Sequence, residues 1–145
     1  MARAIQRFEV SLKAFIVRDG RALLVREADT GYWELPGGRI DVGEEWEPHD
    51  AVLAREIAEE LGAAFRVEVG GETVTWTRRR PSDGVFQFVV GRVCRHVAGE
   101  PVLSDEHDDL AWVMPGEWRS LQLPPESGYA EALDRLWQRA ALLTR

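Results

Sequence analysis

The stretch from Gly38 to Gly62 constrains this chain more than any other segment, because it predicts a glycine-containing loop followed by an amphipathic helix. Pro48 suits the start of the helix, since proline is favoured at the first helical position. The helix is expected to run to Leu61 and to end at Gly62, which can adopt a left-handed conformation. At about 100° per residue, its small and aliphatic side chains form one face. These side chains are Leu53, Ala54, Ile57, Ala58 and Leu61, and the helix should pack on a core along them.

The opposite face of this predicted helix is acidic and carries Arg55, Glu56, Glu59 and Glu60. The glutamates have i, i+3, i+4 spacing, so their side chains are neighbours and repel one another by roughly 0.2–0.5 kcal/mol per pair when no cation is bound. Carboxylates grouped in this way suit Mg²⁺ or Mn²⁺, which bind oxygen ligands. A solvated acidic face is the ordinary alternative for such a pattern. The Leu-Pro-Gly-Gly loop that precedes the helix favours the metal site here.

Stretches rich in β-forming residues surround this segment. Asp19-Gly20 between two apolar runs is a strong hairpin signal. Gly70-Gly71 is expected to separate or kink one pair of strands, and Arg78-Arg79-Arg80 to begin a loop. The expected strands cover Phe8–Val17, Ala22–Arg26, Phe65–Val69, Thr73–Thr77, Val85–Val97 and Leu110–Val113, and a second helix covers Gly128–Leu143. This pattern predicts an α/β sandwich around a mixed β-sheet.

Length and charge limit the classes of protein to consider. The 145 residues fit a single domain, 1–145, and 45% hydrophobic residues can bury a substantial core. The net charge of −7 argues against a binder of nucleic acid polymers, whereas a small nucleotide stays compatible because bound metal reverses the local field. Without an apolar signal segment or membrane span, we expect a cytoplasmic protein that does not contact membranes. The lone Cys94, in an apolar run, predicts a buried, inert thiol.

The stretch from Gly38 to Gly62 resembles the Nudix box, G-x5-E-x7-R-E-U-x-E-E-x-G-U, in which U is an aliphatic residue. The matching residues are Gly38, Glu44, Arg55, Glu56, Ile57, Glu59, Glu60, Gly62 and Ala63. The opening hairpin, the segment Trp33–Gly38 and the later Trp112-Val113 follow in the order of the family, so the resemblance covers most of the chain.

The chain departs from the box in one place, because ten residues instead of seven lie between Glu44 and Arg55. Glu47 has the seven-residue spacing, but its use would place Asp41 at the glycine position. We therefore prefer Glu44, with three extra residues between Glu45 and Asp50, in a connection where insertions are tolerated.

The resemblance implies a Nudix-type α/β/α sandwich with a mixed β-sheet between helices, and hydrolysis of a nucleoside diphosphate linked to another group. In such enzymes a metal-activated water attacks phosphorus, and Mg²⁺, or Mn²⁺ in its place, neutralises charge on the leaving phosphate. The small size of the chain favours nucleoside triphosphates as substrates. A dinucleoside polyphosphate hydrolase and a Nudix-fold module that binds a nucleotide without cleaving it are the alternatives. Family members are often dimers, so a homodimer is a further expectation.

By position, the resemblance makes Glu56, Glu59 and Glu60 metal ligands, together with the backbone carbonyl of Gly38. It implies that Glu56 also orients or deprotonates the attacking water. It assigns Arg55 to holding the loop and the catalytic carboxylates in place.

Two further glutamates join the catalytic residues that the resemblance implies. Glu44 does so as the first glutamate of the box. Glu106 lies in an acidic loop before a strand that ends at Trp112. Many family members resemble this arrangement and carry at a similar place an acidic residue that is an additional metal ligand or the base. A solvated loop charge is the alternative for Glu106. The neighbouring His107 has no matching metal partner, which favours a structural role.

Arginine and tryptophan side chains are candidates for substrate binding. Guanidinium groups bind phosphates in a bidentate manner, which makes Arg26, Arg39 and Arg78 candidates. For Arg78 an exposed basic loop is an equal alternative. Trp33, Trp46 and Trp76 could each stack on a base or lie in the core. Of the three, Trp33 is predicted to contact the substrate.

Overall fold

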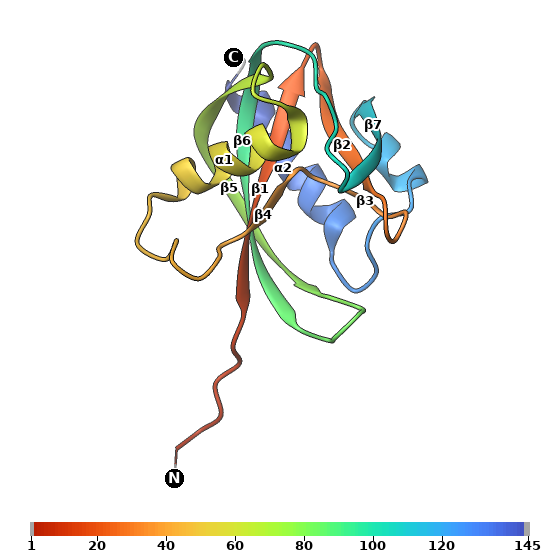
Figure 1. Cartoon of the computed structure of the whole chain (residues 1–145). Helices are drawn as coiled ribbons and strands as arrows, with labels where there is room; N and C mark the ends of the chain where they lie inside the picture. The colour runs from red at the N-terminus through yellow and green to blue at the C-terminus, as the bar shows by residue number, and fades with distance from the viewer. Residues whose placement is uncertain (1, 144–145) are drawn as a thin grey trace.

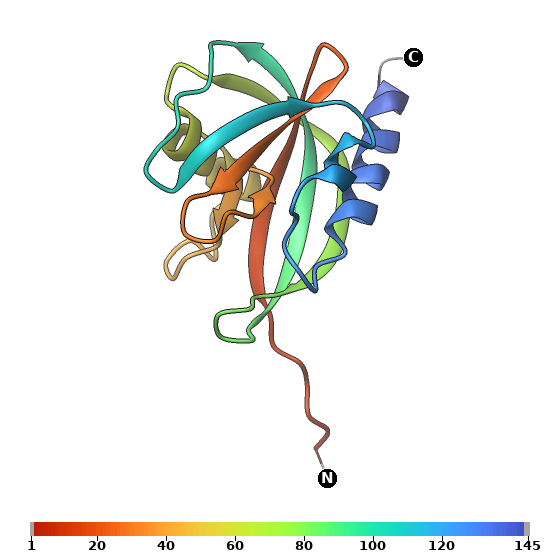
Figure 2. The same ribbon diagram turned by 90° about the vertical axis from the view of Figure 1, so that its right-hand side faces the viewer.

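The computed structural model of the protein describes residues 2–143, and its elements form a β-sheet with a helix on each face (Figure 1 and Figure 2). The strands are β1 (Glu9–Arg18), β2 (Arg21–Glu27), β3 (Trp33–Glu34), β4 (Gly37–Arg39), β5 (Arg66–Arg79), β6 (Phe86–Ala98) and β7 (His107–Val113). The helices are α1 (His49–Leu61), the short 3-10 helix η1 (Glu117–Ser120) and α2 (Tyr129–Leu143). None of the helices within residues 2–143 is long and apolar enough to cross a membrane.

Strand β1 lies at the centre of the sheet, because it pairs with β2 on one side and with β6 on the other. The pairing of β1 with β6 is parallel, and the pairings of β1 with β2 and β4, of β2 with β3 and β7, and of β5 with β6 are antiparallel. The sheet is therefore mixed, and the predicted α/β sandwich is confirmed.

The two faces of β1 belong to different cores, because successive side chains of a strand point to opposite sides. Leu12 and Ile16 pack in the core beneath α1, whereas Phe15 packs in the core beneath α2. Figure 2 shows the two helices on opposite sides of the sheet. Because β1 is buried on both faces, its apolar run matches the sequence pattern of a central strand.

Helix α1 is rotated relative to the face predicted from the sequence. Leu53, Ile57 and Leu61 are buried as predicted, but Ala54 and Ala58 are exposed, and Val52 and Glu60 are buried in their place. The prediction that Glu60 lies opposite the apolar face, with Glu56 and Glu59, is therefore wrong. The physical reason is that β4 runs beside the helix and its backbone binds the Glu60 carboxylate, as described below.

The ends of α1 differ slightly from the prediction. Pro48 occupies the position before the first helical residue, His49. Gly62 follows the helix with φ 90° and ψ 150°, and its N–H donates to the carbonyl of Ala58. The φ of Gly62 is positive as expected, but its ψ lies outside the left-handed helical region that the sequence predicts.

Strand β5 is continuous across Gly70-Gly71, with an irregular register against β6 between Val69 and Thr73. The glycines therefore kink the strand by a bulge and do not divide it. At its other end β5 pairs with β6 as far as Arg79, so the prediction that Arg78 and Arg79 begin a loop is wrong. On β6, Cys94 is buried as predicted, and burial raises the pKa of its thiol to about 12.

Candidate active site

A pocket of about 990 Å³ opens beside the C-terminal half of α1. Its walls come from β1, the turn between β2 and β3, β4, α1, the end of β5 with the loop that follows, and the loop before β7. Glu56, Glu59 and Glu60 all line it, together with Gly38 and Glu106. The fold thus brings these five predicted site residues to one pocket.

The three glutamates of α1 lie in different environments. Glu60 is buried, and its Oε2 atom accepts a hydrogen bond from the backbone N–H of Gly37 at 2.8 Å. The carboxylate of Glu56 is half-buried against Gly38, where a Cβ atom would lie only 2.5 Å from it. Glu59 is exposed and pairs with Arg55. Two of the three carboxylates therefore depend on the glycines of β4 for their position.

Burial changes the proton affinity of Glu60. Loss of solvent raises the pKa of this carboxyl to about 7, although the nearby charge of Lys13 and the hydrogen bond from Gly37 lower it. Burial also raises the pKa of Glu56, against the opposing effect of Arg55. A cation in the pocket would lower the pKa of both carboxyl groups, because a nearby positive charge favours their ionised forms.

Arg55 connects the loop before α1 with the acidic side of the helix. Its Nη2 atom lies 2.5 Å from Glu44 Oε2 and 3.2 Å from Glu56 Oε1, and its Nη1 atom lies 3.0 Å from Glu59 Oε1. Glu44 also accepts the N–H of Asp41 at 2.9 Å, and this hydrogen bond, followed by that from Arg55, lowers its pKa. The three extra residues thus leave Glu44 in contact with Arg55, as the choice of Glu44 in the box requires.

A buried ion cluster forms the floor of the pocket around Glu34. Its Oε1 atom lies 3.4 Å from Lys13 Nζ and 3.7 Å from Arg78 Nη1, and its Oε2 atom lies 3.1 Å from His107 Nε2. Although burial alone would raise the pKa of Glu34, the charge of Lys13 and the hydrogen bond from His107 lower it to about 2. The sequence prediction missed Lys13 and Glu34. The available signal was a lysine inside the apolar run of β1.

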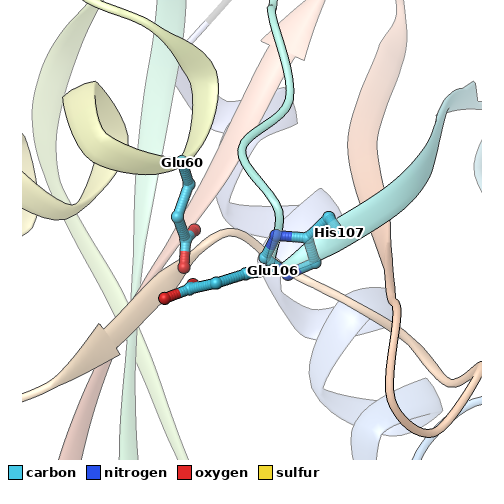
Figure 3. Close-up of side chains that lie close together, drawn as sticks. All are labelled: Glu60, Glu106 and His107. Atoms are coloured by element: carbon cyan, nitrogen blue, oxygen red, sulfur yellow. The ribbon is translucent and has the colours of Figure 1, made fainter.

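Glu106 and His107 meet Glu60 at one side of the pocket. Each of the three residues offers a ligand atom, and these atoms all lie within 4.8 Å of one another. Figure 3 shows the Glu60 side chain descending from α1 towards the Glu106 carboxylate and the His107 ring, which come from the loop and the first residue of β7. This strand begins earlier than Leu110, its predicted first residue.

The arginines predicted to bind substrate separate into two groups. Arg39 and Arg78 line the pocket, and Arg78 is buried beside Glu34 where an exposed loop position was the alternative. Arg26 pairs with Asp108 at 2.7 Å and lies 5.8 Å from the ring centre of Trp33. Neither Arg26 nor Trp33 belongs to the described residues that line the pocket.

The other two tryptophans have opposite environments. Trp76 is 7% exposed and lies in the core beneath α2. Trp46 is 94% exposed, in the segment before α1 that holds the three extra residues. The alternative that Trp46 lies in the core is therefore wrong.

Comparison with known proteins decides the family. A family model described as the NUDIX domain matches residues 8–136. The chain belongs to this family. The solution structure of the E. coli ORF135 protein, 28% identical, superposes on 96% of this chain and 92% of its own with a TM-score of 0.69. The Nudix-type α/β/α sandwich is thus confirmed as the fold.

The chain is also similar in sequence to curated bacterial proteins. A MutT-like protein of Streptomyces ambofaciens is 38% identical over 109 residues, which cover 74% of this chain and 65% of that protein. Nucleoside triphosphatase NudI of Salmonella arizonae is 31% identical over 118 residues, which cover 71% of this chain and 79% of that protein. The chain thus spans just under two thirds of the length of the Streptomyces relative.

Proposed function

We propose that this NUDIX domain is a divalent-metal-dependent pyrophosphohydrolase that cleaves nucleoside triphosphates. The observation that carries the proposal is the meeting of Glu56, Glu59 and Glu60 with the backbone of Gly38 in one pocket. A volume of about 990 Å³ suits a small-molecule ligand, since such pockets span roughly 300–1,000 Å³. The likeness to a nucleoside triphosphatase favours this substrate class. The single domain predicted over residues 1–145 is part of the proposal, because one sheet unites all the strands.

The donor atoms around α1 fit Mg²⁺, with Mn²⁺ as a substitute. The carboxylates of Glu56, Glu59 and Glu60 and the carbonyl of Gly38 supply the oxygen ligands that these cations take. The crowding of Glu56 against Gly38 supports this fit, because any side chain at position 38 would displace the carboxylate. A metal bound there would lower the pKa of a bound water and neutralise charge on the leaving phosphate.

The side chains around the pocket have separate roles in catalysis and substrate binding. Glu56 orients the attacking water, and Glu106 acts as the base or as an additional ligand. Arg39 and Arg78 hold the phosphates, since both guanidinium groups line the pocket. Arg55, anchored by Glu44, keeps the carboxylates in position. Substrate contacts by Arg26 and Trp33 stay predictions.

A panel of nucleotides tests the proposal, with release of nucleoside monophosphate and pyrophosphate measured in the presence of Mg²⁺. The panel contains nucleoside triphosphates and a dinucleoside polyphosphate, and compares the natural protein with Glu60→Gln and with Glu131→Gln, an exposed glutamate of α2. We expect turnover of triphosphates by the natural protein and Glu131→Gln. Preference for the dinucleoside would select that alternative. Tight binding without turnover in Mg²⁺ or Mn²⁺ would identify a binding module, and equal turnover by Glu60→Gln would exclude the metal role.

Metal affinity should increase with pH across neutrality. Because burial raises the pKa of Glu60 to about 7, this carboxyl is mostly protonated at pH 6 and mostly ionised at pH 8. A carboxylate must lose its proton to bind a metal, so the affinity for Mn²⁺ should increase roughly tenfold over this interval. Isothermal titration calorimetry of the metal-free protein at several pH values measures the change. An affinity that does not depend on pH would contradict the assignment of Glu60 as a ligand.

Arg55→Lys should retain the fold and lower turnover. Lysine cannot contact Glu44, Glu56 and Glu59 together, because it lacks the planar group with which arginine reaches all three. We expect kcat to decrease roughly 10–100-fold, the range typical when a partner that orients metal ligands is lost. Steady-state kinetics measure the effect, with Arg66→Lys at an exposed position of β5 as the matched control. A decrease in kcat of the same size in Arg66→Lys would contradict the assignment of Arg55 to positioning the carboxylates.

A further inference from the structure

The two ring nitrogens of His107 have different surroundings. Nε2 lies 3.1 Å from Glu34 Oε2 and is accounted for by this hydrogen bond. Nδ1 is buried and has no hydrogen-bond partner among the described residues. The whole side chain is 2% exposed, so bulk water does not reach this atom. An unpaired buried polar atom destabilises a protein by about 1–3 kcal/mol, and the structural role of His107 therefore explains only one of its nitrogens.

The ring of His107 lies against two carboxylates. Its ligand atom and those of Glu60 and Glu106 are all within 4.8 Å of one another, and Figure 3 shows a ring nitrogen on the side that faces Glu60. Two ligands that each lie 2.1 Å from one ion can be at most about 4.2 Å apart. The three groups are thus within about 1 Å of binding distance, and the exposed Glu106 lies in the loop before β7.

The contact between Glu34 and His107 has the form of an outer-shell interaction at a metal site. A histidine that binds a metal through one ring nitrogen almost always donates its other N–H to a carboxylate or carbonyl. Glu34 is that acceptor here, and Lys13 and Arg78 hold it ionised. This arrangement fixes the tautomer with hydrogen on Nε2 and leaves the lone pair of Nδ1 free to bind a metal.

We propose that Glu60, Glu106 and Nδ1 of His107 form a second metal site in the pocket, with nitrogen and oxygen ligands. Imidazole suits transition metals such as Mn²⁺, Co²⁺ and Zn²⁺, whereas Mg²⁺ prefers oxygen ligands alone. The site therefore selects a transition metal and lies next to the oxygen-only site of Glu56 and Glu59. It shares Glu60 and Glu106 with the proposed function and rests on that proposal for these two residues, whereas His107 is specific to the second site.

Pulsed electron paramagnetic resonance of bound Mn²⁺ tests this site directly, because a coordinated imidazole adds nitrogen hyperfine coupling to the signal. The experiment uses the 145-residue chain, with excess Mg²⁺ present to fill the oxygen-only site. The chain has three histidines, so His49→Asn with His96→Asn leaves His107 alone. We expect nitrogen coupling in the natural protein and in this double variant, and its loss in His107→Asn. Isotope labelling of histidine should change the nitrogen coupling in the natural protein. This measurement does not depend on whether a variant of the buried His107 folds.

Calorimetry gives the second measurement. His107→Asn should weaken Mn²⁺ binding at this site by roughly 10–100-fold. His49→Asn, at an exposed position, should leave the affinity unchanged. Absence of nitrogen coupling in the natural protein at saturating Mn²⁺ would overturn this inference and leave the proposed function intact if Mg²⁺ supports turnover. Nitrogen coupling without turnover of any nucleotide would instead support the second site and contradict the proposed function.

Discussion

Glu60→Gln is expected to lower kcat on the order of 10³-fold while making the metal-free protein more stable. Glutamine keeps the shape of the side chain and can still accept the N–H of Gly37 through its amide oxygen. It lacks the negative charge that binds a divalent cation. Since metal binding stabilises the developing phosphate charge by several kcal/mol, its loss at one ligand accounts for an effect of this size.

The gain in stability follows from the pKa of Glu60. The folded protein raises this pKa from 4.5 to about 7, so between these pH values the folded state binds more protons than the unfolded state. Stability therefore decreases as the pH rises through this interval, and the charged carboxyl destabilises the folded protein by at most about 3 kcal/mol at pH 8. Glu60→Gln removes that penalty. Its midpoint of urea unfolding should exceed that of the natural protein at pH 8, and the two should converge only below about pH 4, where the carboxyl is protonated in both states.

Glu131→Gln provides the control for both measurements, because it makes the same chemical change at an exposed position of α2. We expect its turnover and its stability to equal those of the natural protein. If Glu60→Gln proved less active and also less stable at pH 8, the carboxylate would be a structural group and not a metal ligand.

Gly37→Ala should decrease the free energy of unfolding by roughly 4 kcal/mol or more, in the range of the most damaging single substitutions. A Cβ atom on Gly37 would lie 2.0 Å from the carbonyl oxygen of Leu12 and 2.9 Å from the Cα atom of Lys13. Both are backbone atoms of β1 in the pairing with β4, so neither can rotate away. The φ of +139° at Gly37 also disfavours any residue other than glycine.

Chemical unfolding followed by circular dichroism measures this loss of stability. Gly71→Ala is the matched control, because Gly71 has no atom within 4 Å of its Cβ position and should change the stability by less than about 0.5 kcal/mol. Equal stability of Gly37→Ala and the natural protein would mean that β4 does not pair closely with β1. Gly38→Ala lies between the two cases, since its Cβ meets the movable carboxylate of Glu56 and should disturb the site more than the fold.

Local patterns in the sequence predicted the features that depend on local structure. The extent of α1 and the burial of Leu53 and Ile57 follow from periodicity and from the residues at its ends. The burial of Glu60 does not, because it depends on the backbone of Gly37, which lies 23 residues earlier in the chain. Apolar periodicity assigned Glu60 to the acidic side of the helix, opposite the apolar face, because it counts a carboxylate as polar whatever lies beside it.

The buried cluster at the pocket floor was beyond prediction for a similar reason. Glu34 meets Lys13 across 21 residues and His107 across 73, and single residues of these types give no sign of such distant partners. Arg78 was misplaced because the arginine run, followed by proline, serine, aspartate and glycine, suggested a loop. Strand β5 instead continues through Arg78 by pairing with β6, and Arg78 lies 3.7 Å from Glu34.

The parallel pairing of β1 with β6 affects how the protein folds during synthesis. Glu9 pairs with Gln87 and Val17 with Arg95, so the centre of the sheet joins segments that leave the ribosome far apart in time. Until β6 is available, β1 offers an unpaired edge with apolar side chains on both faces, which is prone to aggregation. Contacts between distant segments also slow folding. The pocket, which needs β1 for both Lys13 and the pairing with β4, therefore forms late and is exposed to competition from misfolding until then.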